Sequence, residues 1–423
     1  MTDSQAEALA HWDAYVHNQG PDGIQHLNWI RENEPVLRMP NGPWLITRHE
    51  DIEWVFRSDG GAPVCKNPLV SGHEPPYLRT DGYFRKHFIH NIDHQDGADH
   101  VRVRKLLHRT FTPHAIEGMR EATRRVAEEL LDTAIAAHDG EMDLVSDYAL
   151  LVPTTVIMNL LDIPEEEFTR MQTMVQHTGG VFTPGIDLDA WITRADAIFE
   201  ERHHYFKALV ADRLESPGPD LISELAARRQ ADPDVLSEIE LTMNLTFLVA
   251  AGFDTTVNGI GSALHLLLQH NEQLSAIRED RRLWPQAIEE CLRFQPPLPF
   301  TAPRVAAEAF EIRGQAIEPG DQIWAGVIAG NRDPRVFDDP DTFNIFRETG
   351  IRKKHLTFAM YSAHYCLGAA LARMEMHESL EAISDRFPDM RFSSTPPYQQ
   401  FLVVFGPSRL QLEWGCSDRD RLR

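Results

Sequence analysis

The chain has 423 residues, of which 42% are hydrophobic, and a formal net charge of −23 at pH 7. That length and apolar content suffice for a sizeable core, while the acidic balance argues against nucleic-acid binding, which needs a basic surface. No apolar run is long enough to span a membrane and the start, MTDSQAEALAHWDAYV, lacks the features of a signal peptide, so we expect a cytoplasmic protein without a membrane partner.

Apolar residues at helical spacing dominate the chain. This spacing predicts helices at residues 49–58, 114–135, 189–215 and 285–295. A hairpin is expected at EPVLRM-PNG-PWLITR, and a second short sheet at residues 310–327.

No repeat or linker divides the chain, so we expect a single, mainly α domain over residues 1–423 with a β-rich portion at about 35–60. Residues 59–98 and 176–188 are rich in Gly, Pro and His or Gly and Thr, and show no clear periodicity. Loops of that length in a compact domain are usually functional lids or disordered segments.

The longest predicted helix runs from about Glu240 to His270, and its middle is apolar on every side, which indicates burial. Within it, residues 250–259 read AAGFDTTVNG. A buried carboxylate is costly unless it is paired or protonated, and a threonine hydroxyl bonded to the carbonyl four residues earlier bends a helix. The sequence therefore predicts a locally opened helix beside small side chains. The alternative is a hydrogen-bonded polar spot in an ordinary core helix.

The chain has four widely spaced cysteines, with no CxxC pair: Cys65, Cys291, Cys366 and Cys416. This spacing favours neither a disulfide framework nor a structural zinc site. Cys366 directly precedes a predicted amphipathic helix, in HYCLGAALAR.

Three roles are open for Cys366: a buried structural thiol, a nucleophile with His364 as its base, or a thiolate ligand of haem iron. In an extended segment, residues two apart stand roughly 6.6 Å apart, which is too far for a direct hydrogen bond. The iron ligand explains more of the pattern, because amides at the start of the next helix can donate to the sulfur and Gly368 leaves room for a macrocycle.

Haem also carries two propionates, which need cationic partners. HVRVRK, residues 100–105, places His100 and Arg104 one turn apart on one helix face, and Arg304 is a third candidate. Each of these residues alone is compatible with a solvated surface.

Together these motifs resemble the cytochrome P-450 superfamily, in its soluble bacterial branch of haem-thiolate monooxygenases. The resemblance covers nearly the whole chain in the same order. Its motifs are DGADHVRVR at 96–104, AGFDTT at 251–256, ECLR at 290–293, FDDPDTFNIFR at 337–347 and HYCLGAALAR at 364–373.

The resemblance implies the P-450 fold, a large helical domain with small β-sheets, in which haem b lies between the long central helix and the helix after the cysteine. Cys366 is then the axial iron ligand. The resemblance also implies haem-contacting residues, namely His100, Arg104, Arg304, His364, Gly368 and Ala251. The Glu290–Arg293 pair, joined by Arg347, is then structural. Thr255 is expected to hold the oxygen species and Asp254 to relay protons.

One departure concerns the loop before the ligand. The family usually reads Phe-Gly-x-Gly-x-His-x-Cys, whereas Phe358 stands eight residues before Cys366, Ala359 follows it and both glycines are missing. This predicts a one-residue insertion and a different loop path, because positive φ suits glycine. It also leaves His355 open between a propionate contact and a surface residue.

Substrate contacts are expected from the two unassigned loops, from the segment 298–302 and from the central helix, with the candidates Phe247, Ala250, Leu298, Phe300 and Val403. Plain core packing is the alternative for Phe247. This mostly apolar set suits a small or medium hydrophobic or aromatic substrate. Basic residues of the first loop form an anion clamp or a solvated surface: Arg79, Arg85, Lys86, His87 and His90.

Electrons are expected from an external ferredoxin and its NAD(P)H-dependent reductase, with O2 as the oxidant. The basic segment IRKKH at 351–355 suits docking of an acidic ferredoxin, or is simply a solvated turn. The alternative activities are a haem-thiolate oxidase that couples aromatic groups in natural-product biosynthesis and a non-catalytic haem sensor or carrier. The pair Asp254–Thr255 argues against the sensor, which needs no proton delivery.

Overall fold

The computed structural model describes residues 3–40, 42–57, 59–70, 72, 74–138, 140–175, 186–301, 303–347, 350–399 and 403–415. The helices are α1 (Asp3–His17), α2 (Ile24–Asn33), α3 (His49–Phe56), α4 (Tyr83–His90), α5 (Gly97–Leu107), α6 (Pro113–Ala137), α7 (Leu151–Leu161), α8 (Phe168–Val175), α9 (Leu188–Glu215), α10 (Leu221–Ala231), α11 (Glu238–Gln269), α12 (Asn271–Glu279), α13 (Trp284–Phe294), α14 (Val327–Gly330) and α15 (Ala369–Arg386). The strands are β1 (Val36–Arg38), β2 (Trp44–Ile46), β3 (Val64–Cys65), β4 (Glu141–Asp143), β5 (Arg304–Ala306), β6 (Phe310–Ile312), β7 (Gln315–Ile317), β8 (Gln322–Ala325), β9 (Arg391–Phe392) and β10 (Gln411–Glu413).

The predicted mainly α architecture with small sheets is confirmed, and the five predicted long helical segments correspond to α3, α6, α9, α11 and α13. Local signals set their ends. The Ser237 side chain accepts from the Glu240 amide and the Glu240 side chain accepts from the Ser237 amide, a capping box that begins α11. Thr112 caps α6 directly before Pro113, which is preorganised for a first helical turn.

The largest sheet has the strand order β1-β2-β8-β5-β3. The expected hairpin forms β1 and β2, and β2 pairs in parallel with β8, Trp44 opposite Ile323. The predicted second sheet is only partly right. β6 and β7 form a separate hairpin. β8 instead joins the first sheet, where it pairs with β2 and β5.

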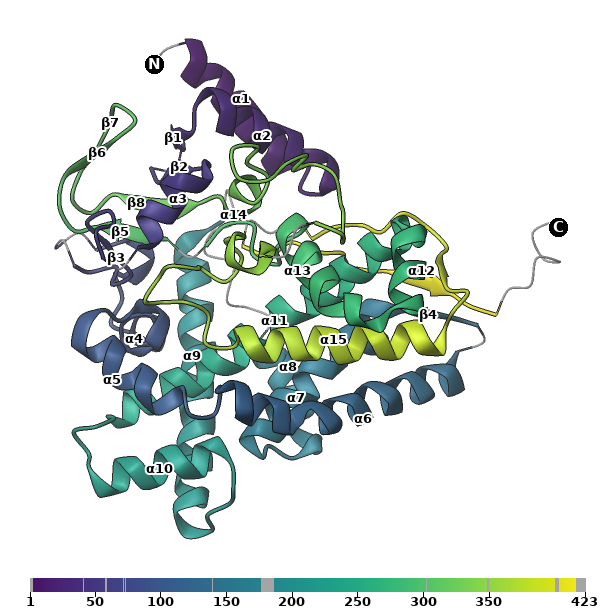
Figure 1. Cartoon of the computed structure of the whole chain (residues 1–423). Helices are drawn as coiled ribbons and strands as arrows, with labels where there is room; N and C mark the ends of the chain where they lie inside the picture. The colour runs from purple at the N-terminus through teal and green to yellow at the C-terminus, as the bar shows by residue number, and fades with distance from the viewer. Residues whose placement is uncertain are drawn as a thin grey trace.

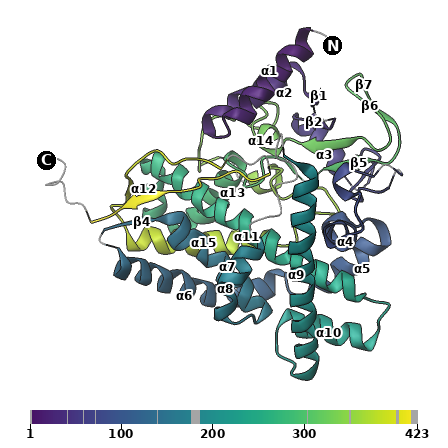
Figure 2. The same ribbon diagram turned by 180° about the vertical axis from the view of Figure 1, so that it is seen from behind.

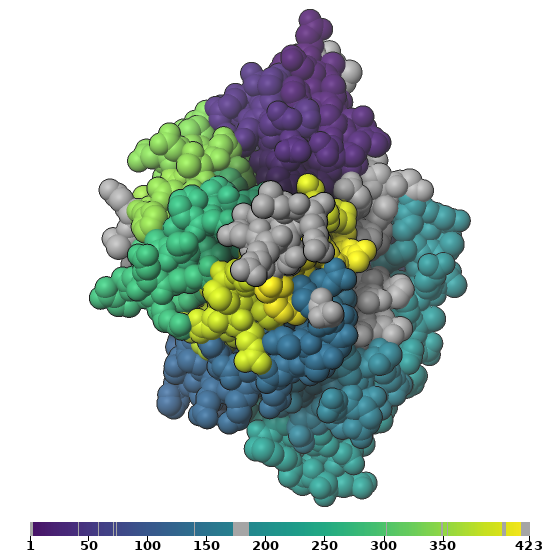
Figure 3. Space-filling view, turned by 90° about the vertical axis from the view of Figure 1, so that its right-hand side faces the viewer, coloured from purple at the N-terminus to yellow at the C-terminus, as the bar shows by residue number. Residues whose placement is uncertain are grey.

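The long helix α11 runs through the middle of the molecule (Figure 1), and α15 and α6 pack against each other below it. Seen from behind, the long helix α9 crosses the molecule in front of α11 (Figure 2), and it packs on α4, α10 and α11. Side chains from α6, α7, α11, α13 and α15 share the main hydrophobic core. In the space-filling view the N-terminal residues form one end of the molecule and the α9–α10 region the other (Figure 3).

The unassigned segment 59–98 is not simply a loop, because it contains β3 and the helix α4. Of the segment 176–188, only residues 186–188 are among those described. None of the described helices is both long and apolar enough to cross a bilayer. The expectation of one domain over residues 1–423 stays a prediction.

Candidate functional site

Cys366 lies in the loop directly before α15. Its amide donates to the Phe358 carbonyl at 3.0 Å, and its carbonyl accepts from the Ala369 amide at 3.3 Å. The sulfur is accessible, yet burial raises the pKa of the thiol against the opposing effects of the Gly368 amide, Arg373 and Arg104. Both observations fit a sulfur that faces an enclosed space. A Cβ added at Gly368 would meet no atom within 4 Å, so a flat group has room beside the cysteine.

The loop before Cys366 keeps left-handed backbone without glycine. Ala359 has φ 53° and Tyr361 has φ 73°, a region that costs a non-glycine residue about 1–2 kcal/mol. The loop therefore contains positive φ angles at residues that rarely adopt them, while the predicted one-residue insertion and altered loop path stay a prediction. Phe358 is buried beneath Arg373, whose guanidinium lies 4.2 Å from the ring centroid.

His355 is not the surface residue of one prediction, while its contact with a propionate stays a prediction. It is buried, and its Nε2 lies 2.8 Å from a Glu289 carboxylate oxygen, which also accepts from Arg373. Burial raises the pKa of Glu289, but the hydrogen bonds from His355 and Arg373 outweigh it and lower that pKa to about 2. Through Arg373, this buried cluster joins the first turns of α15 to α13. Sequence analysis missed it, although Arg373 is part of HYCLGAALAR.

The structure brings the predicted propionate-binding residues together around the segment 362–365. The Arg104 guanidinium donates to the Tyr365 carbonyl at 2.7 Å, and Arg304 donates to the Ser362 hydroxyl at 3.3 Å. The rings of His100 and His364 lie 4.1 Å apart between centroids. β5 positions Arg304, and α5 positions His100 and Arg104 one turn apart.

The electrostatics of this cluster fit an anionic cofactor group. His100 is buried, and its Nε2 has no hydrogen-bond partner among the described residues. Burial, followed by nearby His364 and Arg104, lowers the pKa of His100 to about 4, and burial lowers the pKa of Arg304 to about 10. Buried cations and an unpaired imidazole are stabilised by carboxylates, which the haem propionates would supply. The residues present therefore fit haem.

Two carboxylates that sequence analysis did not single out accompany this cluster. Asp96 accepts from the Lys66 and Asn67 amides at 2.9 and 2.8 Å and lies 3.2 Å from His364 Nε2. Asp93 pairs with the buried Lys66 at 3.0 Å. Both acids lie just before α5. Two acidic residues among histidines are the sequence feature that could have indicated them.

The central helix α11 is helical throughout residues 238–269, so the predicted local opening is not observed. The Thr255 hydroxyl does bond back to the Ala251 carbonyl, at 2.8 Å, as expected for a threonine at this position. Among the described residues the Asp254 carboxylate has no hydrogen-bond partner. Burial raises its pKa to about 6, although the charge of Arg202 opposes that rise.

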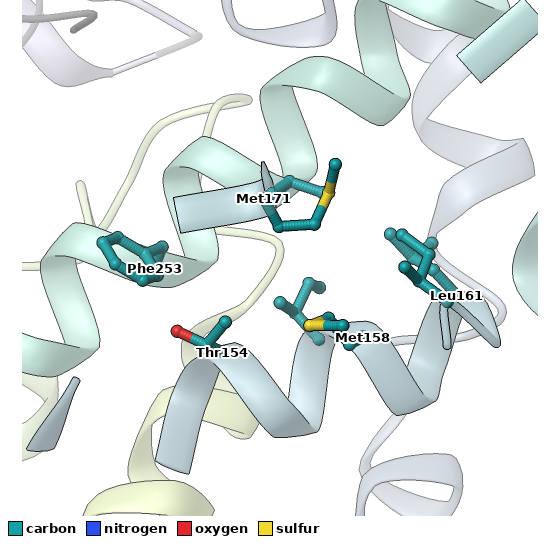
Figure 4. Close-up of a pocket in the computed structure, with 8 residues that line it drawn as sticks. Thr154, Met158, Leu161, Met171 and Phe253 are labelled. Carbon is teal, nitrogen blue, oxygen red and sulfur yellow. The ribbon is translucent and has the colours of Figure 1, made fainter. Parts of the chain in front are cut away.

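A narrow apolar cavity lies behind the central helix (Figure 4). It lies between α7, α8 and α11 and is too narrow to admit a water molecule, and its walls include Met158, Met171, Val249 and Phe253. Val249 and Phe253 lie about 200° around the helix from Ala251 and Thr255 respectively, given 3.6 residues per turn. The cavity therefore opens on the face of α11 opposite the candidate site.

The predicted Glu-x-x-Arg pair and its third member meet in the interior. Arg293 donates to both Glu290 carboxylate oxygens at 2.7 and 2.8 Å, and Arg347 donates to the same carboxylate at 3.0 Å. Arg347 also donates to the Asp339 and Thr342 carbonyls. The arrangement joins α13 to the segment before the cysteine loop.

The predicted substrate contacts separate into two groups. Phe247 and Ala250 are partly buried on α11, Leu298 is partly buried after α13, and Val403 is partly buried in the turn before Phe405. Phe300 is the exception. It packs edge-on against Trp12 and Tyr15 in the N-terminal core, away from the hydrophobic cluster that contains Phe247 and Ala250.

Most charges of the predicted anion clamp have other partners. Arg79 pairs with Asp189, and Arg85 pairs with Glu74. Lys86 lies 4.4 Å from the centroid of the Tyr83 ring. His87 is buried and its Nδ1 has no partner among the described residues, whereas His90 is half-buried.

The comparisons with known proteins agree on one family. A family model described as Cytochrome P450 matches residues 69–414. The chain is 33% identical to Cytochrome P450 107B1 of Saccharopolyspora erythraea, over 92% of this chain and 93% of that protein. It is also 33% identical to 6-deoxyerythronolide B hydroxylase of the same organism, over 86% of this chain and 89% of that one. The solved structure of myxobacterial cytochrome P450 CYP267B1 in complex with myristic acid is similar, with a TM-score of 0.84, 27% identity and coverage of 95% and 98%.

Proposed function

Since this chain belongs to the cytochrome P450 family, we propose that it inserts one oxygen atom of O2 into a small to medium hydrophobic or aromatic substrate. The predicted fold and family are confirmed, and relatives named as hydroxylase and monooxygenase make the chain a P450 monooxygenase. The substrate class is the proposed part. It is supported by the apolar character of Phe247, Ala250 and Leu298.

The observation that carries the proposal is the accessible Cys366 residue beside half-buried Arg104 and buried Arg304, neither of which forms an ion pair with a described carboxylate. The family implies a haem-thiolate cofactor, and we infer haem b held by Cys366. His100, Arg104, Arg304 and His364 would hold its propionates. Bound haem would supply the redox chemistry that activates O2.

The residues of the central helix would supply protons and space. Asp254, with a pKa of about 6, is present in both protonation states near neutral pH and can pass a proton inward. Thr255 would exchange its hydrogen bond to Ala251 for one to the reacting oxygen. The small side chain of Ala251 leaves space on this face of the helix, and a Cβ added at Gly252 would meet only Ile157.

Electrons would arrive from a ferredoxin and its NAD(P)H-dependent reductase. Arg352 is 61% exposed and Lys354 is exposed, both in the segment before the cysteine loop. In a chain of net charge −23, these cations offer an acidic ferredoxin a local site of opposite charge.

The test is product analysis with labelled dioxygen. Compounds that shift the haem spectrum of the holoenzyme are incubated with surrogate ferredoxin, reductase, NAD(P)H and ¹⁸O2. One ¹⁸O atom per product molecule is expected. Two substrate molecules joined without label would instead identify a coupling oxidase, and no product from any binding compound would contradict catalysis.

A further inference from the structure

A buried arginine lies on α9, the long helix that packs on the central helix α11. Arg202, on α9, is 2% exposed, and its Nε, Nη1 and Nη2 atoms have no hydrogen-bond partner in the part of the chain that the structure describes. It forms no ion pair with a described carboxylate. Its guanidinium lies 4.6 Å from the centroid of the Phe199 ring. The charges of Glu201 and Asp254 act on Arg202, but neither carboxylate bonds to it. Because a buried charge without hydrogen bonds is strongly unfavourable, a partner that accepts from this guanidinium would stabilise it.

A second buried polar side chain faces the same ring from another helix. His87, on α4, is 7% exposed, and its Nδ1 has no partner among the described residues. Its ring centroid lies 4.5 Å from that of Phe199. The charge of Arg202 helps to lower the pKa of His87, after burial and His94, so the two basic groups are close enough to interact.

The cluster of Arg202, His87 and Phe199 adjoins the proposed substrate site. α9 and α4 both pack on α11 (Figures 1 and 2). The His87 ring lies 6.3 Å from Phe247, and the charge of Arg202 acts on Asp254. Two unpaired nitrogen-bearing groups and two phenyl rings from three helices thus meet beside the residues proposed for catalysis.

We propose that Arg202 and His87 bind a carboxylate of the substrate. A guanidinium presents parallel N–H groups that match the two oxygens of a carboxylate, and a neutral imidazole adds one donor. The rings of Phe199 and Phe247 suit an apolar body attached to that carboxylate. This inference rests on the proposed function, and it narrows the hydrophobic or aromatic substrate to an organic acid.

It also differs from the clamp predicted from sequence. Arg79, Arg85 and Lys86 have protein partners near the surface, and Arg202 did not belong to that set. Only His87 is common to both. The difference arises because the partners of a charge depend on tertiary packing.

The test compares acids with their uncharged esters. The holoenzyme is titrated with 4-phenylbutanoic acid, dodecanoic acid and the methyl ester of each, and binding is followed by the haem spectral shift and by calorimetry. At least one acid is expected to bind at least tenfold more tightly than its ester. Arg202→Met should remove that preference, Arg202→Lys should retain part of it, and His87→Phe should weaken it.

Arg194→Met is the matched control, because Arg194 is exposed on the same helix α9. It should leave the preference for acids unchanged. Haem content and thermal unfolding report whether each variant folds. If Arg202→Met does not fold, Arg202→Lys and His87→Phe still decide the question.

Equal affinity for acid and ester in the unsubstituted enzyme would overturn the proposal, as would an unchanged preference in folded Arg202→Met. A variant that binds acids normally but releases more peroxide would show that Arg202 serves Asp254 instead, and would also overturn it. These results are independent of oxygen insertion. Acids that bind tightly without being oxidised would contradict the proposed monooxygenation and leave the carboxylate site standing.

Discussion

Polar groups on the two sides of the site differ in how they are partnered. On the side of α13, here called the lower side, Glu290 is bonded to Arg293 and Arg347, and Glu289 is bonded to Arg373 and His355. On the side of α9 and α4, here called the upper side, Arg202 and the Nδ1 atom of His87 have no hydrogen-bond partner among the described residues, and burial raises the pKa of Asp254. A buried charge with partners holds neighbouring segments in place, whereas one without partners is costly unless a ligand pairs with it. We therefore infer that the lower side stabilises the fold and that the upper side binds a ligand.

The largest effect should come from the cysteine between the two sides. Cys366→Ser should abolish the thiolate-type absorption of the ferrous carbonyl complex and substrate oxidation, because serine offers no soft anionic sulfur. Absorption spectroscopy of the reduced, carbon monoxide-treated protein measures this. Cys291→Ala, which changes a buried cysteine of α13, is the control and should retain the absorption. Retention in Cys366→Ser would mean that another residue is the ligand.

Removing one partner on the lower side should cost stability. Arg293→Met leaves the Glu290 charge buried with only Arg347, so the free energy of unfolding should fall by about 3–5 kcal/mol. Urea unfolding of the holoenzyme, followed by circular dichroism, measures it. Arg282→Met breaks an exposed pair with Asp280 and should cause no measurable change. A loss equally small in Arg293→Met would contradict the stabilising role of the lower side.

Substitutions on the upper side should instead change how reducing equivalents are used in the reaction. Thr255→Ala should retain the haem spectrum while diverting reducing equivalents from product to hydrogen peroxide, because the hydroxyl that bonds Ala251 is lost. Thr255→Ser retains a hydroxyl and should couple nearly as the unsubstituted enzyme does. The ratio of peroxide to NAD(P)H consumed measures the effect. Unchanged coupling in the alanine variant would refute the role of Thr255.

Asp254 should make stability depend on pH. Its pKa in the folded protein, about 6, lies above the ordinary value of 3.8, so the folded state holds more protons between these values and its stability falls as pH rises through about 4 to 6. At pH 7 this costs about 3 kcal/mol relative to low pH. Asp254→Asn should lack this fall, as measured by unfolding at pH 4 to 7. Parallel curves for the two proteins would show that the carboxylate titrates normally.

The smallest effect concerns the strained loop. Ala359→Gly should raise the free energy of unfolding by less than about 1 kcal/mol, because relief of the positive φ exceeds the entropy cost of glycine by only a little. Ala363→Gly in the same loop, at a residue without positive φ, should lower it. Chemical denaturation of both variants measures the difference, and the same sign in both would contradict strain at Ala359.

Prediction from sequence succeeded where the signal was local. Helical spacing located α6, α9 and α11, and the residues around Cys366 indicated a haem ligand loop. The sequence carries no local signal for pairing between distant segments such as β2 and β8, so β8 was assigned to the wrong sheet. The burial of Phe300 in the N-terminal core was missed for the same reason.

Arg202 shows a second limit. It lies in EERHHYFK, where charged residues surround it on both sides, and nothing local distinguishes the buried arginine from exposed Glu200 and His204. The packing of α9 on α4 and α11 decides which of these side chains loses water. Similarly, α4 was hidden in a segment of Gly, Pro and His residues.

The parallel pairing of Trp44 with Ile323 has a consequence for how the protein assembles. Contacts between residues so far apart along the chain form slowly, since a long loop must first be closed. Arg304 sits on β5, the neighbour of β8 in that sheet, so its final position depends on this late step. We therefore expect the newly made polypeptide to capture its prosthetic group only near the end of folding, after its first fifty residues have returned to meet the last third of the chain.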